Sequence, residues 1–223
     1  MTGQMSPVRL LVFDLDGTLV DSRGDLAGAA NELLHECGAP PLEEAAVGRM
    51  VGEGASVLVH RVFAAAGLDE PGDALSRFLA LYGRRLLKLT RPYEGVPDVL
   101  LRLGAALPMA VLTNKPTDPA DRLLAGLGLR RYFRFVVGGD GPFARKPDPE
   151  GLQALMAEWD VEPASTLLVG DSAVDLRTAQ NAGARICLAR YGFGYETFPA
   201  AELRGGEWFI DTPLELIQRL DLR

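Results

Sequence analysis

The stretch LVFDLDGTLVDS, residues 11–22, decides the fold of this chain. The apolar run 8–13, which one arginine interrupts, ends directly at Asp14, and Asp16 and Asp21 follow shortly afterwards. A short apolar run bounded by polar residues is typical of a buried strand in a parallel sheet. Carboxylates this close repel one another, and burial makes their ionised forms costlier still. The stretch therefore predicts a buried strand whose end needs a positively charged partner.

Apolar runs of the same kind recur along the chain and alternate with helical patterns. The runs lie at 109–112, 135–137, 166–169 and 185–189. Helices are expected at 96–107, after KPDPE with Asp148 as N-cap and Pro149 in the first turn, and at 172–182 before Gly183. Strands that alternate with helices predict an α/β fold with a doubly wound parallel sheet.

The segment between the first strand and the rest of the sheet breaks this alternation. It contains no convincing strand, and its apolar residues recur at helical spacing. The stretch TRPYEGVP, residues 90–97, where the chain returns to the sheet, is rich in proline and glycine, which predicts a hinge. We therefore expect an all-helical insertion at 21–91 within a core formed by 1–20 and 92–223.

Composition narrows the class of protein. The 223 residues carry a net charge of −7, which argues against a nucleic-acid partner. No window approaches the 18 apolar residues of a membrane span, and the first residues do not resemble a secretory signal. Two cysteines, Cys37 and Cys187, suggest neither a disulfide framework nor a zinc site. These features predict a cytoplasmic protein.

Polar residues follow several of the predicted strands. In an open parallel sheet, ligands bind beyond the carboxyl ends of the strands. The residues expected there are Asp14, Asp16, Thr113, Asn114, Gly170 and Asp171, with Lys146 ahead of a helix. They are far apart in sequence, but a doubly wound sheet can bring them to one edge.

The residue types at that edge suit phosphate chemistry. Asp14, Asp16, Asp171 and Asp175 would form a group of carboxylates, for which Mg²⁺ is the natural partner. Lys146 and the Thr113 hydroxyl would complete a site for a phosphoryl group in spite of the negative overall charge.

The first two acids can take different chemical roles. A carboxylate can act as a nucleophile and form an aspartyl-phosphate, and Asp14 is placed for that. Asp16 can protonate the leaving alcohol and later accept a proton from water. Gly17 permits the sharp backbone turn that such a site needs.

Four short motifs carry a family resemblance. DLDGT (14–18), TN (113–114), KP (146–147) and GDSAVD (170–175) resemble, in order, the motifs of the haloacid dehalogenase-like hydrolase superfamily. YEGVPDVLLRL, VLTNKP, GGD, KPDPE and GDSAVDLRTAQNAGA resemble its phosphoglycolate phosphatase branch. The resemblance covers nearly the whole chain, and the helical insertion resembles that family's cap domain.

The resemblance implies roles for individual residues. It implies Asp14 as nucleophile, Asp16 as acid and base, and Mg²⁺ held by Asp14, Asp171 and the backbone carbonyl of Asp16. It also implies that Thr113, Asn114 and Lys146 stabilise the phosphate and the intermediate, with Asp175 in support. Dehalogenases of this superfamily lack an acid at the second position, so the presence of Asp16 favours phosphoryl transfer.

One further contact is expected from the cap. Arg49 lies in GRMVGEGAS, which resembles the family's substrate-facing cap loop, and it could pair with a substrate carboxylate. A solvated arginine is the competing interpretation. His35 and His60 are expected to be surface or packing residues, and Gly138, Gly139 and Gly141 to form a plain loop.

The sequence predicts a Mg²⁺-dependent phosphatase for small phosphate monoesters, with 2-phosphoglycolate as the first substrate to consider. Three alternatives stay open. They are a phosphatase for sugar phosphates, nucleotides or pyrophosphate, a phosphomutase on the same fold, and a module without catalytic activity. The sequence does not indicate an oligomeric state.

Overall fold

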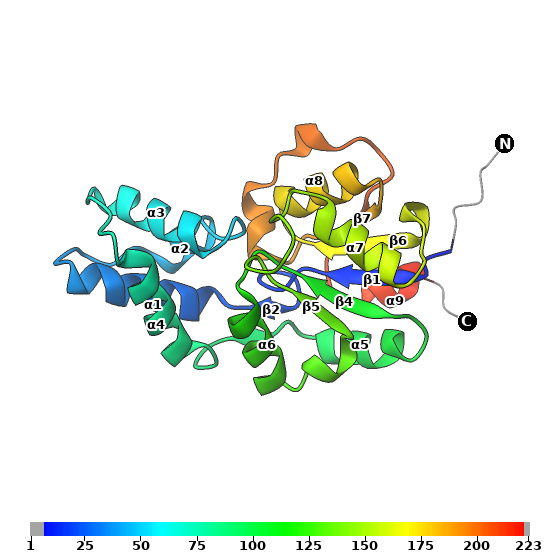
Figure 1. The fold of residues 1–223 in the computed structure, drawn as a ribbon, viewed down its shortest axis with the longest axis horizontal. Coiled ribbons are helices and arrows are strands. Elements are labelled where there is room, and N and C mark those ends of the chain that lie inside the picture. The colour runs from blue at the N-terminus through cyan, green and yellow to red at the C-terminus, as the bar shows by residue number, and fades with distance from the viewer. Residues whose placement is uncertain (1–6, 221–223) are drawn as a thin grey trace.

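The computed structural model describes residues 7–220 and contains a six-stranded sheet in the order β5-β4-β1-β6-β7-β8. Every neighbouring pair in this sheet is parallel (Figure 1). The strands are β1 (Leu10–Phe13), β4 (Met109–Leu112), β5 (Phe135–Val137), β6 (Thr166–Gly170), β7 (Arg185–Ala189) and β8 (Trp208–Ile210). The predicted α/β fold with a doubly wound parallel sheet is confirmed.

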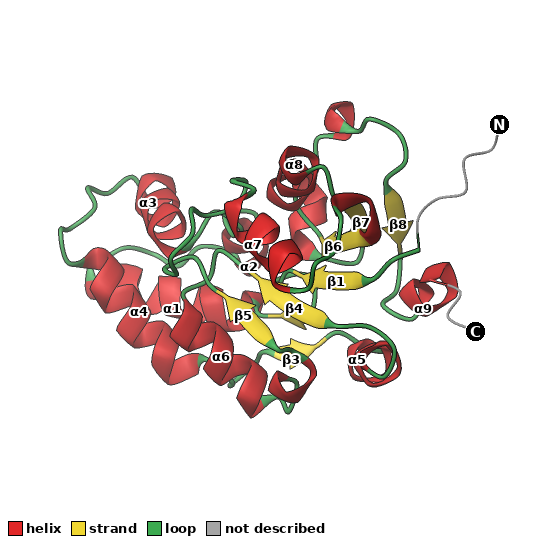
Figure 2. Cartoon of the chain, turned by 45° about the vertical axis from the view of Figure 1, so that its right-hand side comes forward, coloured by secondary structure: helices red, strands yellow, loops and turns green. Residues whose placement is uncertain are grey.

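Helices cover both faces of the sheet (Figure 2). They are α5 (Val96–Gly104), α6 (Thr117–Gly126), α7 (Glu150–Glu158), α8 (Ala173–Ala182) and α9 (Glu215–Leu220). Leu11 and Phe13 of β1 belong to one hydrophobic cluster with residues of α5, α6 and α9, whereas Leu10 and Val12 belong to a second cluster with residues of α7 and α8. Successive residues of a strand face opposite sides, so an uninterrupted apolar run is what a sheet covered on both faces requires.

Several predicted boundaries shift by one to three residues. The first strand begins at Leu10 rather than at residue 8, and the helix expected at 96–107 ends at Gly104. Helix α7 begins at Glu150 with Pro149 as N-cap, not Asp148, although the Asp148 carboxylate still accepts a hydrogen bond from the Glu150 amide at 2.9 Å. Helix ends depend on local capping, which periodicity does not fix.

Four helices lie between the two crossings, the segments at which the chain leaves the core and returns to it. Figure 1 shows these helices to one side of the sheet. They are α1 (Arg23–Glu36), α2 (Glu44–Gly48), α3 (Ala55–Ala66) and α4 (Ala74–Arg85). The two crossings pair with each other as the antiparallel strands β2 (Val20–Asp21) and β3 (Arg91–Pro92). We treat residues 21–91 as a cap and the remainder as a core in the proposals below.

Two expectations concern features away from the site. Over residues 7–220, no helix combines the length and apolar character that a membrane span requires. Cys37 and Cys187 are free thiols. The absence of a secretory signal was expected partly from residues 1–6, which lie outside the described part of the chain.

Candidate active site

The predicted core residues gather at the edge of the sheet where the parallel strands end. Asp14 directly follows β1, Thr113 and Asn114 follow β4, and Asp171 follows β6. Lys146 comes from the loop between β5 and α7. All five residues are buried. The common polarity of the strands is what brings these distant segments together.

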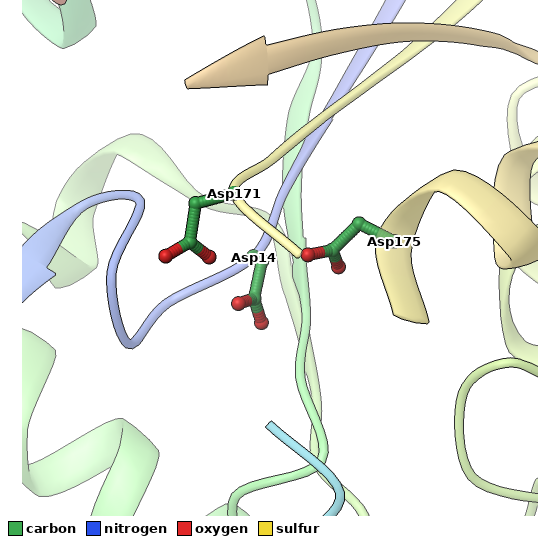
Figure 3. A group of neighbouring side chains, drawn as sticks. All are labelled: Asp14, Asp171 and Asp175. Carbon is green, nitrogen blue, oxygen red and sulfur yellow. The ribbon is translucent and has the colours of Figure 1, made fainter. Parts of the chain in front are cut away.

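Three carboxylates lie close together, as Figure 3 shows, and two of them pair with one lysine. Asp14, Asp171 and Asp175 each offer an oxygen within 4.8 Å of the others. The Lys146 ammonium donates to Asp14 Oδ1 at 2.7 Å and to Asp175 Oδ1 at 2.6 Å. Asp171 Oδ2 accepts a hydrogen bond from the Gly194 amide at 2.8 Å. The sequence analysis predicts all three acids and the lysine at this edge of the sheet.

The charges of this cluster do not balance. Burial, followed by the repulsion of neighbouring acids, raises the pKa of Asp14 to about 6, even though the Lys146 ammonium opposes that rise. Burial and the charges of Asp14 and Asp175 also raise the pKa of Asp171 well above its usual value. The Lys146 ammonium contacts only two of these three buried carboxylates. A bound cation would relieve the remaining repulsion, and hard oxygen donors are the ligands that Mg²⁺ prefers. The donor set therefore fits a divalent cation.

Helix α8 supports one corner of the cluster through its N-terminus. Ser172 is the N-cap, and its hydroxyl donates to Asp175 Oδ2 at 2.6 Å while accepting from the Asp175 amide at 3.3 Å. This reciprocal capping box leaves the other Asp175 oxygen free to accept from Lys146. Asp175 is thus both a helix-capping residue and an ion-pair partner.

The loop after β1 requires glycine at position 17. Gly17 has a φ of 91°, a conformation that other residues adopt only with strain. A Cβ atom built there would lie 2.0 Å from Asp171 Oδ2. The glycine is therefore needed both for the turn and for the space that the Asp171 carboxylate occupies.

Asn114 joins the core to the cap. Its Nδ2 donates to the backbone oxygens of Lys146 and of Gly52, at 2.9 Å in each case. Gly52 belongs to the loop between α2 and α3, so one side chain links the two halves of the molecule. The Asn114 Oδ1 atom is buried and has no hydrogen-bond partner among the described residues.

Asp16 does not join the acid cluster, contrary to the expected group of four carboxylates. Both of its oxygens accept hydrogen bonds from the Lys115 ammonium at 3.0 Å, and Oδ1 also accepts from the Ser22 hydroxyl at 2.6 Å. The same ammonium donates to the hydroxyl of Tyr82, from α4 of the cap, at 2.7 Å. Asp14 and Asp16 are therefore neutralised by two different lysines, and this separates their surroundings.

A pocket of about 540 Å³, part of it open to solvent, lies between the core edge and the cap. Its polar lining comes mainly from the core, whereas its cap side is mostly apolar apart from the Tyr82 hydroxyl. The lining residues are Asp14, Asp16, Leu26, Val51, Gly52, Gly54, Ala55, Leu58, Phe78, Leu79, Tyr82, Thr113, Asn114, Lys115, Pro116 and Pro119. A small molecule in this pocket would contact both predicted reactive acids.

Comparison with known proteins identifies the family. The family profile described as haloacid dehalogenase-like hydrolase matches residues 11–189, which include every motif at the core edge. The chain belongs to the haloacid dehalogenase-like hydrolases.

Relatives within the haloacid dehalogenase-like hydrolases cover most of the chain. A phosphoglycolate phosphatase of Rhodospirillum rubrum is 46% identical over 204 residues, which are 87% of this chain and 84% of the relative. An N-acetylmuramic acid 6-phosphate phosphatase of Pseudomonas aeruginosa is 32% identical and covers 96% of this chain and 95% of its own length. A solved structure described as a predicted phosphoglycolate phosphatase from Haemophilus somnus matches with a TM-score of 0.88 and 31% identity, over 97% of this chain and 99% of that one.

Arg49 is the predicted site residue that the structure places elsewhere. It is the C-cap of α2, its side chain is 46% exposed, and its guanidinium lies 3.8 Å from Glu196 of the core. The loop that follows it does line the pocket through Val51, Gly52 and Gly54, but Arg49 does not. Its proposed contact with a substrate carboxylate stays a prediction from sequence.

Lys115 and Tyr82 are the residues at this site that sequence reasoning missed. Lys115 directly follows the TN motif and belongs to the run VLTNKP, so its position at the core edge could have been predicted from the sequence. For Tyr82 the sequence predicts only that it is one of the apolar residues at helical spacing in the insertion. A sequence pattern predicts which face of a helix is buried, but not which side chain that face meets.

Proposed function

We propose that this chain is a Mg²⁺-dependent phosphatase that hydrolyses small phosphate monoesters, with 2-phosphoglycolate as its substrate. The observation that carries this proposal is one pocket lined by two acids: Asp14, which belongs to the buried acid cluster, and Asp16, which pairs with a different cation. The activity named for the phosphoglycolate phosphatase relatives supports the choice of substrate.

The chemistry runs through two covalent steps. An Asp14 oxygen attacks phosphorus, the bond from phosphorus to the ester oxygen breaks, and Asp16 gives its proton to the departing alkoxide. A water molecule then attacks the aspartyl-phosphate and gives a proton back to Asp16, which releases inorganic phosphate and restores the Asp14 carboxylate. Each proton that leaves Asp16 in the first step returns in the second, so the cycle closes.

Other core residues hold the phosphoryl group during these steps. Asp14, Asp171 and the backbone carbonyl of Asp16 would hold Mg²⁺, which when bound neutralises negative charge on the phosphoryl oxygens. Although burial alone would lower it, the charges of Asp14 and Asp175 raise the pKa of Lys146, so its ammonium stays charged. The Thr113 hydroxyl donates to the phosphoryl oxygens, and Asp175 positions Lys146. Asn114, whose Nδ2 already donates to the backbone oxygens of Lys146 and Gly52, supports the phosphate site by holding the Lys146 segment in place.

The apolar cap side of the pocket favours closure over a small substrate. Expulsion of water from the pocket would strengthen the electrostatic interactions at the core edge and protect the intermediate until the alcohol product leaves. We infer that the crossings at β2 and β3 are the hinges of this motion. The two free cysteines also suit a cytoplasmic location.

The test is release of inorganic phosphate by the purified protein, with Mg²⁺ and after chelation. The panel holds 2-phosphoglycolate, glucose 1-phosphate, a nucleoside monophosphate, pyrophosphate, an aryl phosphate and N-acetylmuramic acid 6-phosphate, which the Pseudomonas aeruginosa relative brings into consideration. We expect kcat/KM for 2-phosphoglycolate to exceed the others at least about tenfold, a difference of about 1.4 kcal/mol. A preference for another compound would overturn the choice of 2-phosphoglycolate as the substrate. If the protein released phosphate from none of these compounds, the proposal of phosphatase activity itself would be overturned.

A further inference from the structure

The pocket contains one cation that the phosphatase chemistry above does not use. Among the described residues that line the pocket, Lys115 is the only one with a positively charged side chain. Lys146 does not line the pocket, and Asp14 and Asp175 both accept from its ammonium. The charge that faces the substrate from the leaving-group side is therefore that of Lys115.

Lys115 is held firmly at this position. Its side chain is 4% exposed, and its ammonium lies 3.0 Å from both Asp16 oxygens and 2.7 Å from the Tyr82 hydroxyl. The ammonium also lies 4.4 Å from the centre of the Tyr82 ring. Although burial by itself would lower it, the nearby Asp16 carboxylate raises the pKa of Lys115, so the amine is charged at neutral pH.

The position of Lys115 matches the chemistry of a short hydroxy-acid leaving group. Asp16 must contact the ester oxygen in order to protonate it, and in 2-phosphoglycolate one methylene separates that oxygen from the carboxylate. A substrate with its ester oxygen at Asp16 can therefore place its carboxylate within reach of the Lys115 ammonium, which contacts Asp16. The apolar neighbours Leu26, Leu58 and Phe78 line the remaining space and would strengthen a charge pair formed there.

We propose that Lys115 binds the carboxylate of the substrate and that Tyr82 of the cap holds its ammonium in place, which makes Lys115 the residue that selects phosphorylated 2-hydroxy acids. This inference rests on the proposed function. Arg49 is not needed for this contact, because its guanidinium faces Glu196 outside the pocket. Selection by the cap would then act through Tyr82, which contacts the selecting lysine rather than the substrate.

The experiment compares two substrates that differ only in the group that Lys115 would bind. Ethyl phosphate has a methyl group where 2-phosphoglycolate has its carboxylate. For the wild type we expect a higher kcat/KM on 2-phosphoglycolate. In Lys115→Met this preference should fall at least about tenfold, mainly through a raised KM for 2-phosphoglycolate, since a charge-assisted hydrogen bond is lost. Tyr82→Phe, which removes only the hydroxyl, should reduce the preference less.

The controls separate binding from positioning. Lys88→Met removes an exposed lysine of the cap and should leave the preference unchanged. If Lys115 only positions Asp16, Lys115→Met will lower kcat equally on both substrates and keep the preference, which would overturn the inference. Loss of the preference in Arg49→Ala but not in Lys115→Met would overturn it as well and would assign the contact to Arg49.

Product inhibition supplies a second readout that does not depend on turnover of 2-phosphoglycolate. With an aryl phosphate as substrate, Lys115→Met should weaken inhibition by glycolate at least about tenfold while inhibition by inorganic phosphate stays nearly the same. Lys115→Gln serves the same purpose if the methionine variant does not fold. A wild type without preference for 2-phosphoglycolate would defeat the proposed function, whereas a preference that survives in both Lys115 variants would defeat this inference alone.

Discussion

At the scale of single residues, two aspartates only two positions apart have different partners. Asp14 accepts from Lys146 and belongs to the buried acid cluster, whereas Asp16 accepts from Lys115 and Ser22. A nucleophile must stay ionised near the phosphoryl group, whereas an acid must be able to gain and lose a proton. Separate cations would allow the same residue type to fill both of the roles proposed for Asp14 and Asp16.

Replacement of Asp14 tests the nucleophile. Asp14→Asn keeps the size of the side chain but cannot form the aspartyl-phosphate, so we expect kcat to fall by roughly 1,000-fold or more. The fold should persist, because the substitution removes a buried charge that its neighbours repel. Phosphate release and thermal unfolding measure the two effects. A near-normal rate would show that another group attacks phosphorus.

Gly17 offers a matched pair of substitutions. Gly17→Ala combines a strained φ with a Cβ that would lie 2.0 Å from Asp171 Oδ2, whereas Gly38 has a φ of 75° but no atom within 4 Å of its would-be Cβ. We expect Gly38→Ala to lower the free energy of unfolding by about 1 kcal/mol and Gly17→Ala by about 3 kcal/mol or more. Urea unfolding measures both, and equal losses would mean that strain alone decides the cost.

At the scale of elements, the two crossings between cap and core are tied by one carboxylate. Asp25 in the first turn of α1 is fully buried. Its Oδ2 accepts from the amides of Leu89 and Thr90, at 2.9 and 2.8 Å, and from the Thr90 hydroxyl at 2.8 Å. The chain thus leaves and re-enters the core at a fixed separation, which the β2–β3 pair also maintains.

Loss of this carboxylate should loosen the crossings. Asp25→Ala leaves two amides without their acceptor, so we expect a loss of about 3 kcal/mol in unfolding free energy and faster proteolysis near residues 86–95. Thr90→Val removes one of the three hydrogen bonds and should cost about 1 kcal/mol. Urea unfolding and limited proteolysis would reveal the difference. If the two variants lost the same stability, the amide bonds to Asp25 would contribute little.

At the scale of the whole molecule, a chain with a net charge of −7 has to bind an anion. The field at the pocket is set locally, by Lys115, by Lys146 and by the cation that the acid cluster fits. Buried charges interact more strongly than exposed ones, because less water screens them. The surface acids therefore do not decide what binds at the core edge.

The metal should stabilise the fold in a pH-dependent way. A carboxyl whose pKa is raised from 3.8 to about 6 on folding, as for Asp14, binds more protons in the folded state. The metal-free protein therefore loses stability as pH rises through that range. Metal binding needs deprotonated ligands, so saturating Mg²⁺ should raise Tm by roughly 5–10 °C near neutral pH and by less near about pH 5.

Two variants check the origin of this stabilisation. Asp171→Asn removes a predicted ligand and should abolish most of the gain, whereas Asp211→Asn, which removes an exposed partner of Arg190, should keep it. Differential scanning fluorimetry with and without Mg²⁺ measures the gain. A shift of the same size in Asp171→Asn would place the metal elsewhere.

The sequence alone determined the architecture and most of the core edge. Short apolar runs located five of the six strands, and helical periodicity predicted the helices that lie between β2 and β3. Strand β8, three residues at one edge of the sheet, was not predicted, whereas the equally short β5 at the other edge was. Three residues are too few to show a period, so the sequence signal of such strands is weak. The alternation of elements was enough to place Asp14, Thr113, Asn114, Lys146 and Asp171 together, since parallel strands end at one edge.

Only the tertiary structure decided which charges pair. Asp16 meets Lys115 across 99 residues, Lys115 meets Tyr82 from the cap, and Arg49 turns to Glu196 instead of the pocket. Hydrophobic periodicity is a local property that sets which face of an element is buried. The partner of a buried charge depends on the packing of segments distant in sequence, and no local pattern contains that information.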